Sequence, residues 1–236
     1  MTSWTILCDF DGTISTCDVT DVLLERFAGP GWEELEHLWR AGKIGSRECM
    51  AGQVALFDAS ADELDKVVDA VEIDPWFSDF VTQARLAGAR IVVVSDGLDR
   101  VIKRILHNHG LGDLPVTANH LVQVGSRSWQ STFPNRDDSC RSGSGNCKCA
   151  FARGVQGADR GTLLVGDGRS DFCVAGRVDF VFAKDSLLEH CRRAGLPHAP
   201  ISNFNDAALL LPSVLRGALL PPPSSHKADL LLRAYP

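Results

Sequence analysis

The stretch Trp4-Thr5-Ile6-Leu7-Cys8-Asp9-Phe10-Asp11-Gly12-Thr13 decides the fold, because an apolar run passes directly into an acidic one. The apolar half predicts a strand that is buried on both faces of a parallel sheet. Asp9 and Asp11 follow at its carboxyl end, where the strand pleat gives residues two apart the same general direction. One interpretation is a simple turn before Gly12; the other is a buried pair of like charges that needs a cation or a shared proton.

Three further apolar runs predict strands of the same sheet: Arg90–Val94, Thr162–Val165 and Asp179–Ala183. Helical segments separate these strands, so we expect an α/β fold with the strands parallel and side by side. Polar turns follow two of the runs, at Ser95–Gly97 and Gly166–Gly168. Ligands of open parallel sheets bind at the carboxyl ends of the strands. The three polar strand ends therefore predict one shared site.

The region between the first two predicted strands is expected to be helical. Its apolar residues recur at helical spacing, and Ser60–Glu63 has the pattern of a capping box. Asp74-Pro75 is expected to start the last helix of this region and Gly88 to end it. We predict an α/β core over residues 1–14 and 76–216, a helical insert over 15–75 and a proline-rich tail over 217–236. Within the core, a hairpin is expected in 115–134 and a loop over 135–146.

The composition limits the class of protein. At about 150 residues per domain, 236 residues predict one large domain or one domain with an insert. The chain is 44% hydrophobic and 23% charged, which is typical of a globular protein. Its net charge, 24 − 30 = −6, disfavours binding to nucleic acid or to an anionic membrane. No apolar run reaches the ~18–20 residues of a membrane span and no signal-peptide pattern is present, so we expect a cytoplasmic protein.

A second acidic stretch, Gly166-Asp-Gly-Arg-Ser-Asp171, indicates which cation the site takes. Several carboxylates that meet in a dry cleft need a hard divalent cation, and oxygen ligands suit Mg²⁺, which also accepts a substrate phosphate. The Ser95 hydroxyl and the amides beside it offer donors to an anion. Lys148, at an expected helix start, supplies a positive charge.

Eight cysteines are too few, in a chain of this length, for a disulfide scaffold. Only Cys140, Cys147 and Cys149 cluster in the sequence. They are interpreted either as zinc ligands, with Cys173, His120 or water as a fourth ligand, or as the thiols of a reduced or redox-sensitive loop. Their spacing departs from the usual pairs of zinc ligands, which favours reduced thiols.

The stretches around Asp9, Ser95, Lys148 and Asp167 resemble, in this order, the four motifs of the haloacid dehalogenase superfamily. The resemblance implies a Rossmann-like core with a parallel sheet and a small helical cap inserted between the first two motifs. The insert is similar to the type-1 cap of the phosphoserine phosphatase branch. The stretch Phe182–Arg192 and the Cys-Lys pair look most like phosphatases of methionine salvage, which act on 2-hydroxy-3-keto-5-methylthiopentenyl-1-phosphate.

The same resemblance implies a Mg²⁺-dependent phosphomonoesterase. Asp9 is then the nucleophile that forms an aspartyl-phosphate, and Asp11 is the acid for the leaving group and the base for water. Mg²⁺ is expected on the carboxylates of Asp9 and Asp167 and on the backbone carbonyl of Asp11. Lys148, oriented by Asp171, is expected to neutralise charge on the transferring group.

The substrate is expected to be a small phosphorylated metabolite. The resemblance assigns its phosphate group to Ser95, Asp96, Gly97 and Gly12. Asp18 is expected near the rest of the substrate. Phosphoserine phosphatases use a cap arginine for the substrate carboxylate; Gln53 stands at that position in this chain, although Arg47 is nearby. That departure puts phosphoserine in doubt. The alternatives are a phosphocholine, phosphoethanolamine or phosphoserine phosphatase, a phosphotransferase or mutase, and a binding module of the same fold without activity.

Overall fold

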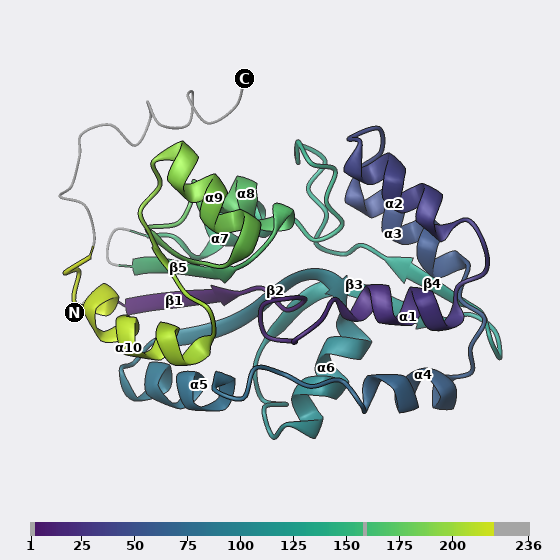
Figure 1. The fold of residues 1–236 in the computed structure, drawn as a ribbon, viewed down its shortest axis with the longest axis horizontal. Helices are drawn as coiled ribbons and strands as arrows, with labels where there is room; N and C mark the ends of the chain where they lie inside the picture. Colours follow the sequence, from purple (N-terminus) through teal and green to yellow (C-terminus); the bar gives the residue numbers. More distant parts are fainter. Residues whose placement is uncertain (1–2, 158–159, 220–236) are drawn as a thin grey trace. The chain divides into compact units, whose positions relative to one another are not determined.

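The computed structural model describes residues 3–157 and 160–219, and it divides into two compact units (Figure 1). Unit 1 is formed by the segments Met1–Ile14, Asp74–Val92 and Lys148–Pro236, and unit 2 by Ser15–Ile73 and Val93–Cys147. Unit 2 therefore contains most of the predicted insert together with later residues, and the domain boundaries themselves stay a prediction. The predicted tail lies outside the described residues from residue 220 onward.

The acidic stretch that begins at Asp9 directly follows a strand in the sheet of unit 1. The strands of this sheet are β1 (Ser3–Cys8), β5 (Arg160–Gly166), β6 (Phe180–Ala183), β7 (His198–Pro200) and the first residues of β2 (Arg90–Leu98), in the order β2-β1-β5-β6-β7. The described pairs among β1, β5, β6 and β7 are parallel, with Leu7 opposite Leu164 and Leu164 opposite Val181. These side chains are buried, and the strands have apolar residues at consecutive rather than alternate positions, as expected of a sheet that is covered on both faces.

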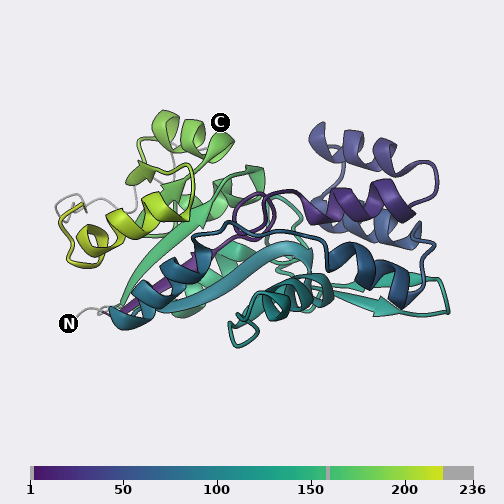
Figure 2. The same cartoon turned by 60° about the horizontal axis from the view of Figure 1, so that its bottom comes forward.

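Helices of unit 1 complete its core. They are α5 (Phe77–Leu86), α7 (Lys148–Val155), the short 3₁₀ helix η1 (Arg169–Asp171), α8 (Phe172–Ala175), α9 (Asp185–Ala194) and α10 (Phe204–Leu215). Helices α5 and α10 lie side by side (Figures 1 and 2), with the rings of Phe77 and Phe204 4.7 Å apart. Asp74 Oδ2 accepts a hydrogen bond from the Phe204 N–H at 3.0 Å. Asp74 thus joins the two helices, and α5 begins at Phe77, two residues later than Pro75 predicts.

Unit 2 holds the predicted helices and hairpin. Its elements are α1 (Val19–Phe27), α2 (Trp32–Arg40), α3 (Ser46–Ala55), α4 (Ala61–Val68), the rest of β2, α6 (Asp99–Asn108), β3 (Val116–Gln123) and β4 (Trp129–Thr132). The capping box of Ser60 and Glu63 is confirmed at the start of α4. The hairpin is confirmed as the antiparallel pair β3–β4, and Trp129 Nε1 donates to the Ala59 carbonyl at 2.8 Å.

The sheet as a whole has seven strands, mostly parallel, which confirms the predicted α/β fold. Two details differ from the prediction. Strand β2 does not end at Val94 but continues to Leu98, with a shift of its register against β3, so Ser95–Gly97 is an irregular part of a strand rather than a turn. Strand β7 was missed because three residues ending in Pro200 give no strand pattern. No helix of the described residues is long and apolar enough to cross a membrane.

Candidate active site

Asp9 stands at the carboxyl end of β1, where its N–H donates to the Val165 carbonyl at 2.9 Å and continues the ladder with β5. Asp9 is 5% exposed as a residue, and its Oδ1 accepts a hydrogen bond from the Phe10 N–H at 2.8 Å. The strand and this short bond fix the carboxylate, while Oδ2 remains for other partners. A buried anion in this position needs positive charge or donors close by.

Asp167 follows β5, the neighbouring strand, and faces the loop after β1. Thr13 Oγ1 donates to its Oδ1 at 2.6 Å. Gly12 has a φ of +69°, and a Cβ placed on it would lie 2.7 Å from Asp167 Oδ2. Glycine is therefore required twice at position 12, for the left-handed backbone and for the close approach of the carboxylate.

Lys148, the first residue of α7, is buried and lies between two carboxylates. Its Nζ is 2.7 Å from Asp9 Oδ2 and 2.7 Å from Asp171 Oδ1, and it donates to Ser170 Oγ at 3.0 Å. Ser170 Oγ in turn donates to Asp9 Oδ2 at 3.3 Å. Burial acts to lower the pKa of Lys148, but the adjacent Asp171 and Asp9 outweigh it and hold the pKa above its usual value. Lys148 is therefore a fixed cation at this site.

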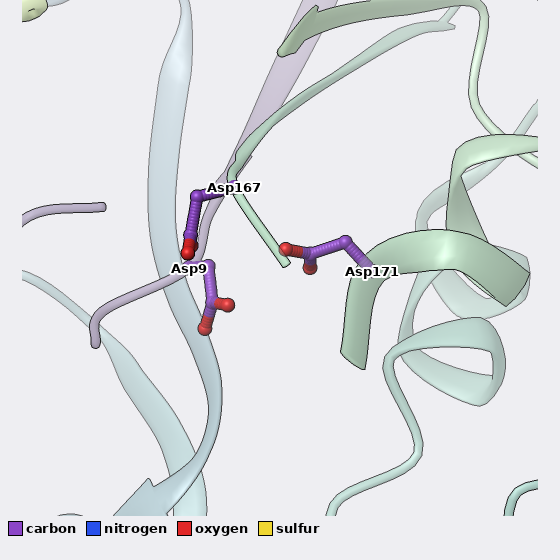
Figure 3. A group of neighbouring side chains, drawn as sticks. All are labelled: Asp9, Asp167 and Asp171. Atoms are coloured by element: carbon purple, nitrogen blue, oxygen red, sulfur yellow. The ribbon is translucent and has the colours of Figure 1, made fainter. Parts of the chain in front are cut away.

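Asp9, Asp167 and Asp171 form one acidic cluster, with an oxygen of each within 4.8 Å of the others. Figure 3 shows the three side chains converging from the ends of β1 and β5 and from η1. Burial raises the pKa of Asp167, and the charge of Asp9 raises it further. Burial and the charge of Asp9 likewise hold the pKa of Asp171 well above its usual range, although Lys148 opposes them.

The acidic cluster fits a divalent cation. When all are ionised, its three carboxylates and the ammonium of Lys148 have a net charge of −3 + 1 = −2. One divalent cation balances this charge. Asp171 Oδ2 is buried without a hydrogen-bond partner among the described residues. The donors are all hard oxygens, the ligands that Mg²⁺ and Ca²⁺ prefer. Among the described residues this is the one group of three acidic, histidine or cysteine side chains close enough to share a cation.

Four of the predicted site residues belong to unit 2. The Oγ of Ser95 accepts a hydrogen bond from the Gly97 N–H at 2.9 Å, and Ser46 Oγ donates to Asp96 Oδ2 at 2.6 Å. Asp18 is the N-cap of α1, because its Oδ1 accepts from the Asp21 N–H at 3.1 Å. The side chains of Asp96 and Asp18 thus both accept hydrogen bonds from other groups of unit 2.

The structure adds contacts that the sequence analysis did not single out. Lys184 Nζ donates to the carbonyl of Gly12 at 2.9 Å and so holds the loop after β1. Ser170 and Thr13 contact Lys148 and Asp167, as described above. Thr13 lies two residues after Asp11 and Ser170 directly before Asp171, and this nearness to the predicted aspartates was the available signal. Asp11 is half-buried in the loop after β1.

No disulfide joins any cysteines of the described residues. Cys149 Sγ donates to Cys173 Sγ at 3.2 Å, and Cys140 Sγ lies 3.2 Å from Ser142 Oγ. The bond from Cys149 is the largest influence that lowers the pKa of the Cys173 thiol to about 6, aided by Lys148 and opposed by burial. Cys140, Cys147 and Cys149 do not form a group of metal ligands in the part of the chain that is described.

Comparison with known proteins adds independent information. The family model described as haloacid dehalogenase-like hydrolase matches residues 6–176. A protein named 2-hydroxy-3-keto-5-methylthiopentenyl-1-phosphate phosphatase, from Brevibacillus brevis, is 31% identical over 89% of this chain and 95% of its own length. A protein of the same name from Geobacillus kaustophilus is 30% identical over 85% of this chain and 92% of its own length.

Solved structures show the same fold. A phosphoserine phosphatase from T. onnurineus has a TM-score of 0.66 and 18% identity, and the match covers 89% of this chain and 94% of that one. A structure described as a phospho-aspartyl intermediate analogue of phosphoserine phosphatase has a TM-score of 0.61 and 20% identity, covering 80% of this chain and 90% of that one.

Proposed function

Because the chain belongs to the haloacid dehalogenase-like hydrolase family, we propose that it is a Mg²⁺-dependent phosphomonoesterase that works through an aspartyl-phosphate. The observation that carries this proposal is the position of Lys148, buried and 2.7 Å from both Asp9 and Asp171. An ammonium held in this way offsets the negative charges of the Asp9 nucleophile and of the phosphate that Asp9 must attack. Such fixed positive charge is what phosphoryl transfer requires.

Asp9 is the proposed nucleophile. Its Oδ1 is engaged by the Phe10 N–H, and the contacts of Oδ2 come from Lys148 and Ser170. Oδ2 attacks phosphorus in line with the leaving oxygen, so a phosphorus–oxygen bond forms to Asp9 as the bond to the substrate oxygen breaks. Asp11 gives its proton to the departing alkoxide and then takes one from the water that hydrolyses the aspartyl-phosphate.

Mg²⁺ is the proposed cation, held by the carboxylates of Asp9 and Asp167 and by the backbone carbonyl of Asp11. When bound, it would polarise the phosphoryl group and reduce repulsion between the nucleophile and the phosphate. Thr13 and Gly12 position Asp167 for this role through the contacts given above. The donors proposed for the phosphate are the Ser95 hydroxyl and the amides around Gly12 and Gly97; these assignments come from the motif order.

The proposed substrate is a 2-hydroxy-3-keto-5-methylthiopentenyl-1-phosphate or a similar small phosphate ester, since relatives at about 30% identity bear that name. Gln53 supports a substrate without a carboxylate. It is 3% exposed, and its Nε2 donates to Glu36 Oε2 at 3.3 Å, so this position carries a neutral amide beside an acid. A location in the cytoplasm is also proposed, because reduced thiols persist in a reducing compartment.

The first test is hydrolysis of p-nitrophenyl phosphate with and without Mg²⁺. We expect turnover with Mg²⁺, loss of turnover in EDTA, and loss of turnover in the Asp9→Asn variant. Asp167→Asn is expected to raise the Mg²⁺ concentration needed for half-maximal rate. Asp79→Asn, at an exposed position of α5, is the matched control and should behave as the wild type. A wild-type rate in Asp9→Asn, or full activity in EDTA, would contradict the proposal.

A second test separates the substrate classes. We expect the methylthiopentenyl phosphate to give a higher kcat/KM than phosphocholine, phosphoethanolamine or phosphoserine. A higher kcat/KM for phosphoserine would show that the reading of Gln53 is wrong. Product that forms only when an acceptor alcohol is present would identify a phosphotransferase instead.

A further inference from the structure

Asn146 is a fully buried polar residue at the end of the predicted loop, two residues before Lys148 in the sequence. Its side-chain amide donates to the backbone carbonyls of Ser95 at 2.7 Å and Thr117 at 2.8 Å. Its backbone N–H donates to Asp96 Oδ1 at 2.9 Å. One residue thus holds β2 to β3 within unit 2.

The Asp96 carboxylate is held from three directions. Oδ1 accepts from the Asn146 N–H and from Asn119 Nδ2 at 3.1 Å, and Oδ2 accepts from Ser46 Oγ. Asn119 Nδ2 also donates to the Asp96 carbonyl at 2.5 Å. An acidic side chain beside a phosphate would repel it, whereas these donors commit the carboxylate to the surrounding protein.

These contacts replace hydrogen bonds that the sheet does not supply at this point. The register of β2 against β3 shifts between Val94 and Leu98, so the regular ladder is interrupted around Ser95–Gly97. Ser95 Oγ accepts from the Gly97 N–H, and a hydroxyl that accepts in this way keeps its own hydrogen for another partner. The direction of that hydrogen depends on how the irregular segment is held.

We propose that Asn146 is a positioning residue for phosphate recognition, which holds Ser95–Gly97 in the conformation that lets the Ser95 hydroxyl donate to a phosphoryl oxygen. The inference rests on the proposed function and gives Asn146 no contact with the substrate. In Asn146→Ala, the carbonyls of Ser95 and Thr117 lose their side-chain donor, and the segment can shift. A displacement of about 1 Å of a positioned group costs about 10²-fold in rate.

The test compares two constants in the full-length protein: the inhibition constant of inorganic phosphate against p-nitrophenyl phosphate, and the Mg²⁺ concentration for half-maximal rate. We expect Asn146→Ala to raise the phosphate constant by about tenfold to 10²-fold and to leave the Mg²⁺ constant unchanged. Asn135→Ala is the matched control. Asn135 also donates its amide to a β3 carbonyl, that of Ala118 at 3.3 Å. Because this bond does not involve Ser95–Gly97, the control should change neither constant.

An unchanged phosphate constant in Asn146→Ala overturns the inference, as does an equal rise of both constants, which would indicate a general loss of structure. If this variant does not fold, Asn119→Ala tests the same segment. Asn119 Nδ2 donates to the carbonyl and to Oδ1 of Asp96, and its Oδ1, like that of Asn146, is buried without a partner among the described residues. A raised phosphate constant there supports the inference, and an unchanged one overturns it.

Failure of the proposed function can be distinguished from failure of the inference about Asn146. If the wild type hydrolyses no phosphate ester, that function fails, and calorimetric titration with inorganic phosphate and Mg²⁺ then tests Asn146 alone. Weaker phosphate binding in Asn146→Ala than in the wild type supports the inference. Equal binding, or no binding in either protein, overturns it.

Discussion

Single residues decide how tightly the acidic cluster is built, and Gly12 is the clearest case. An alanine there must adopt a φ of +69° and would place its Cβ 2.7 Å from Asp167 Oδ2. We expect Gly12→Ala to lose about 10²-fold in kcat/KM because Asp167 is displaced, and about 1–2 kcal/mol of stability because of the backbone strain. Enzyme kinetics and urea unfolding measure the two effects.

Gly88→Ala is the control for that experiment. Gly88 has a φ of +75° but no atom near its Cβ position, so it carries the same strain without the contact. It should lose stability and keep its kcat/KM. Equal activity in the Gly12 and Gly88 variants would show that the approach to Asp167 has no catalytic consequence.

Cys173 is predicted to react as a thiolate at neutral pH. Its pKa is lowered to about 6, so the thiolate predominates above that value and is lost as the pH falls through it. We expect the rate of alkylation of Cys173 by iodoacetamide, followed by mass spectrometry, to be level from pH 7 to 8 and about tenfold lower at pH 5.

The Cys149→Ala variant tests the cause of the low pKa. Removing the donor 3.2 Å away takes away the largest influence that lowers it, so the pH profile should move to higher pH. A rate for the wild type that still rises tenfold between pH 7 and 8 would refute the assignment.

At the scale of elements, the helices of unit 2 depend on a hairpin that is distant in sequence. Trp129 of β4 is 3% exposed and donates to the carbonyl of Ala59, just before α4. We expect Trp129→Phe to lower the free energy of unfolding by about 1–3 kcal/mol, because that carbonyl loses its donor inside the protein. Urea denaturation measures the change. Trp76→Phe, at a position that is 46% exposed, is the control, and equal unfolding midpoints in the two variants would speak against this coupling.

Elements with a strong local pattern were the ones that the sequence predicted well. The continuous apolar runs of β1 and β5 mark buried parallel strands, and the Ser60–Glu63 pair is a local cap that needs no tertiary contact. The continuation of β2 through Ser95–Gly97 was not predictable, because Asp-Gly favours a turn, and the bonds from Asn146 that hold this segment come from a residue distant in the sequence. The start of α5 was placed two residues early, because Pro75 and Trp76 form a turn before the regular helix, although Asp74 accepts from the Trp76 N–H as an N-cap does.

At the scale of the molecule, the convergence of Asp9 and Asp167 followed from strand ends in a parallel sheet, and the structure brings both into one cluster with Asp171. The partners of these aspartates were harder to predict. Lys184 binds the Gly12 carbonyl from 172 residues away, and Asn146 binds Ser95 from 51 residues away. Neither residue type carries a local signal for such a bond, since lysines and asparagines are mostly surface residues.

The discontinuous make-up of unit 1 affects its biosynthesis. Asp9 leaves the ribosome 167 − 9 = 158 residues ahead of Asp167, and β1 acquires its neighbour β5 over the same interval. At about 5–20 residues per second, translation of that interval takes about 8–30 s. During that time β2 is the only neighbour of β1 that has been synthesised. The edge of β1 that later pairs with β5 stays open to chaperones until the acidic cluster can assemble.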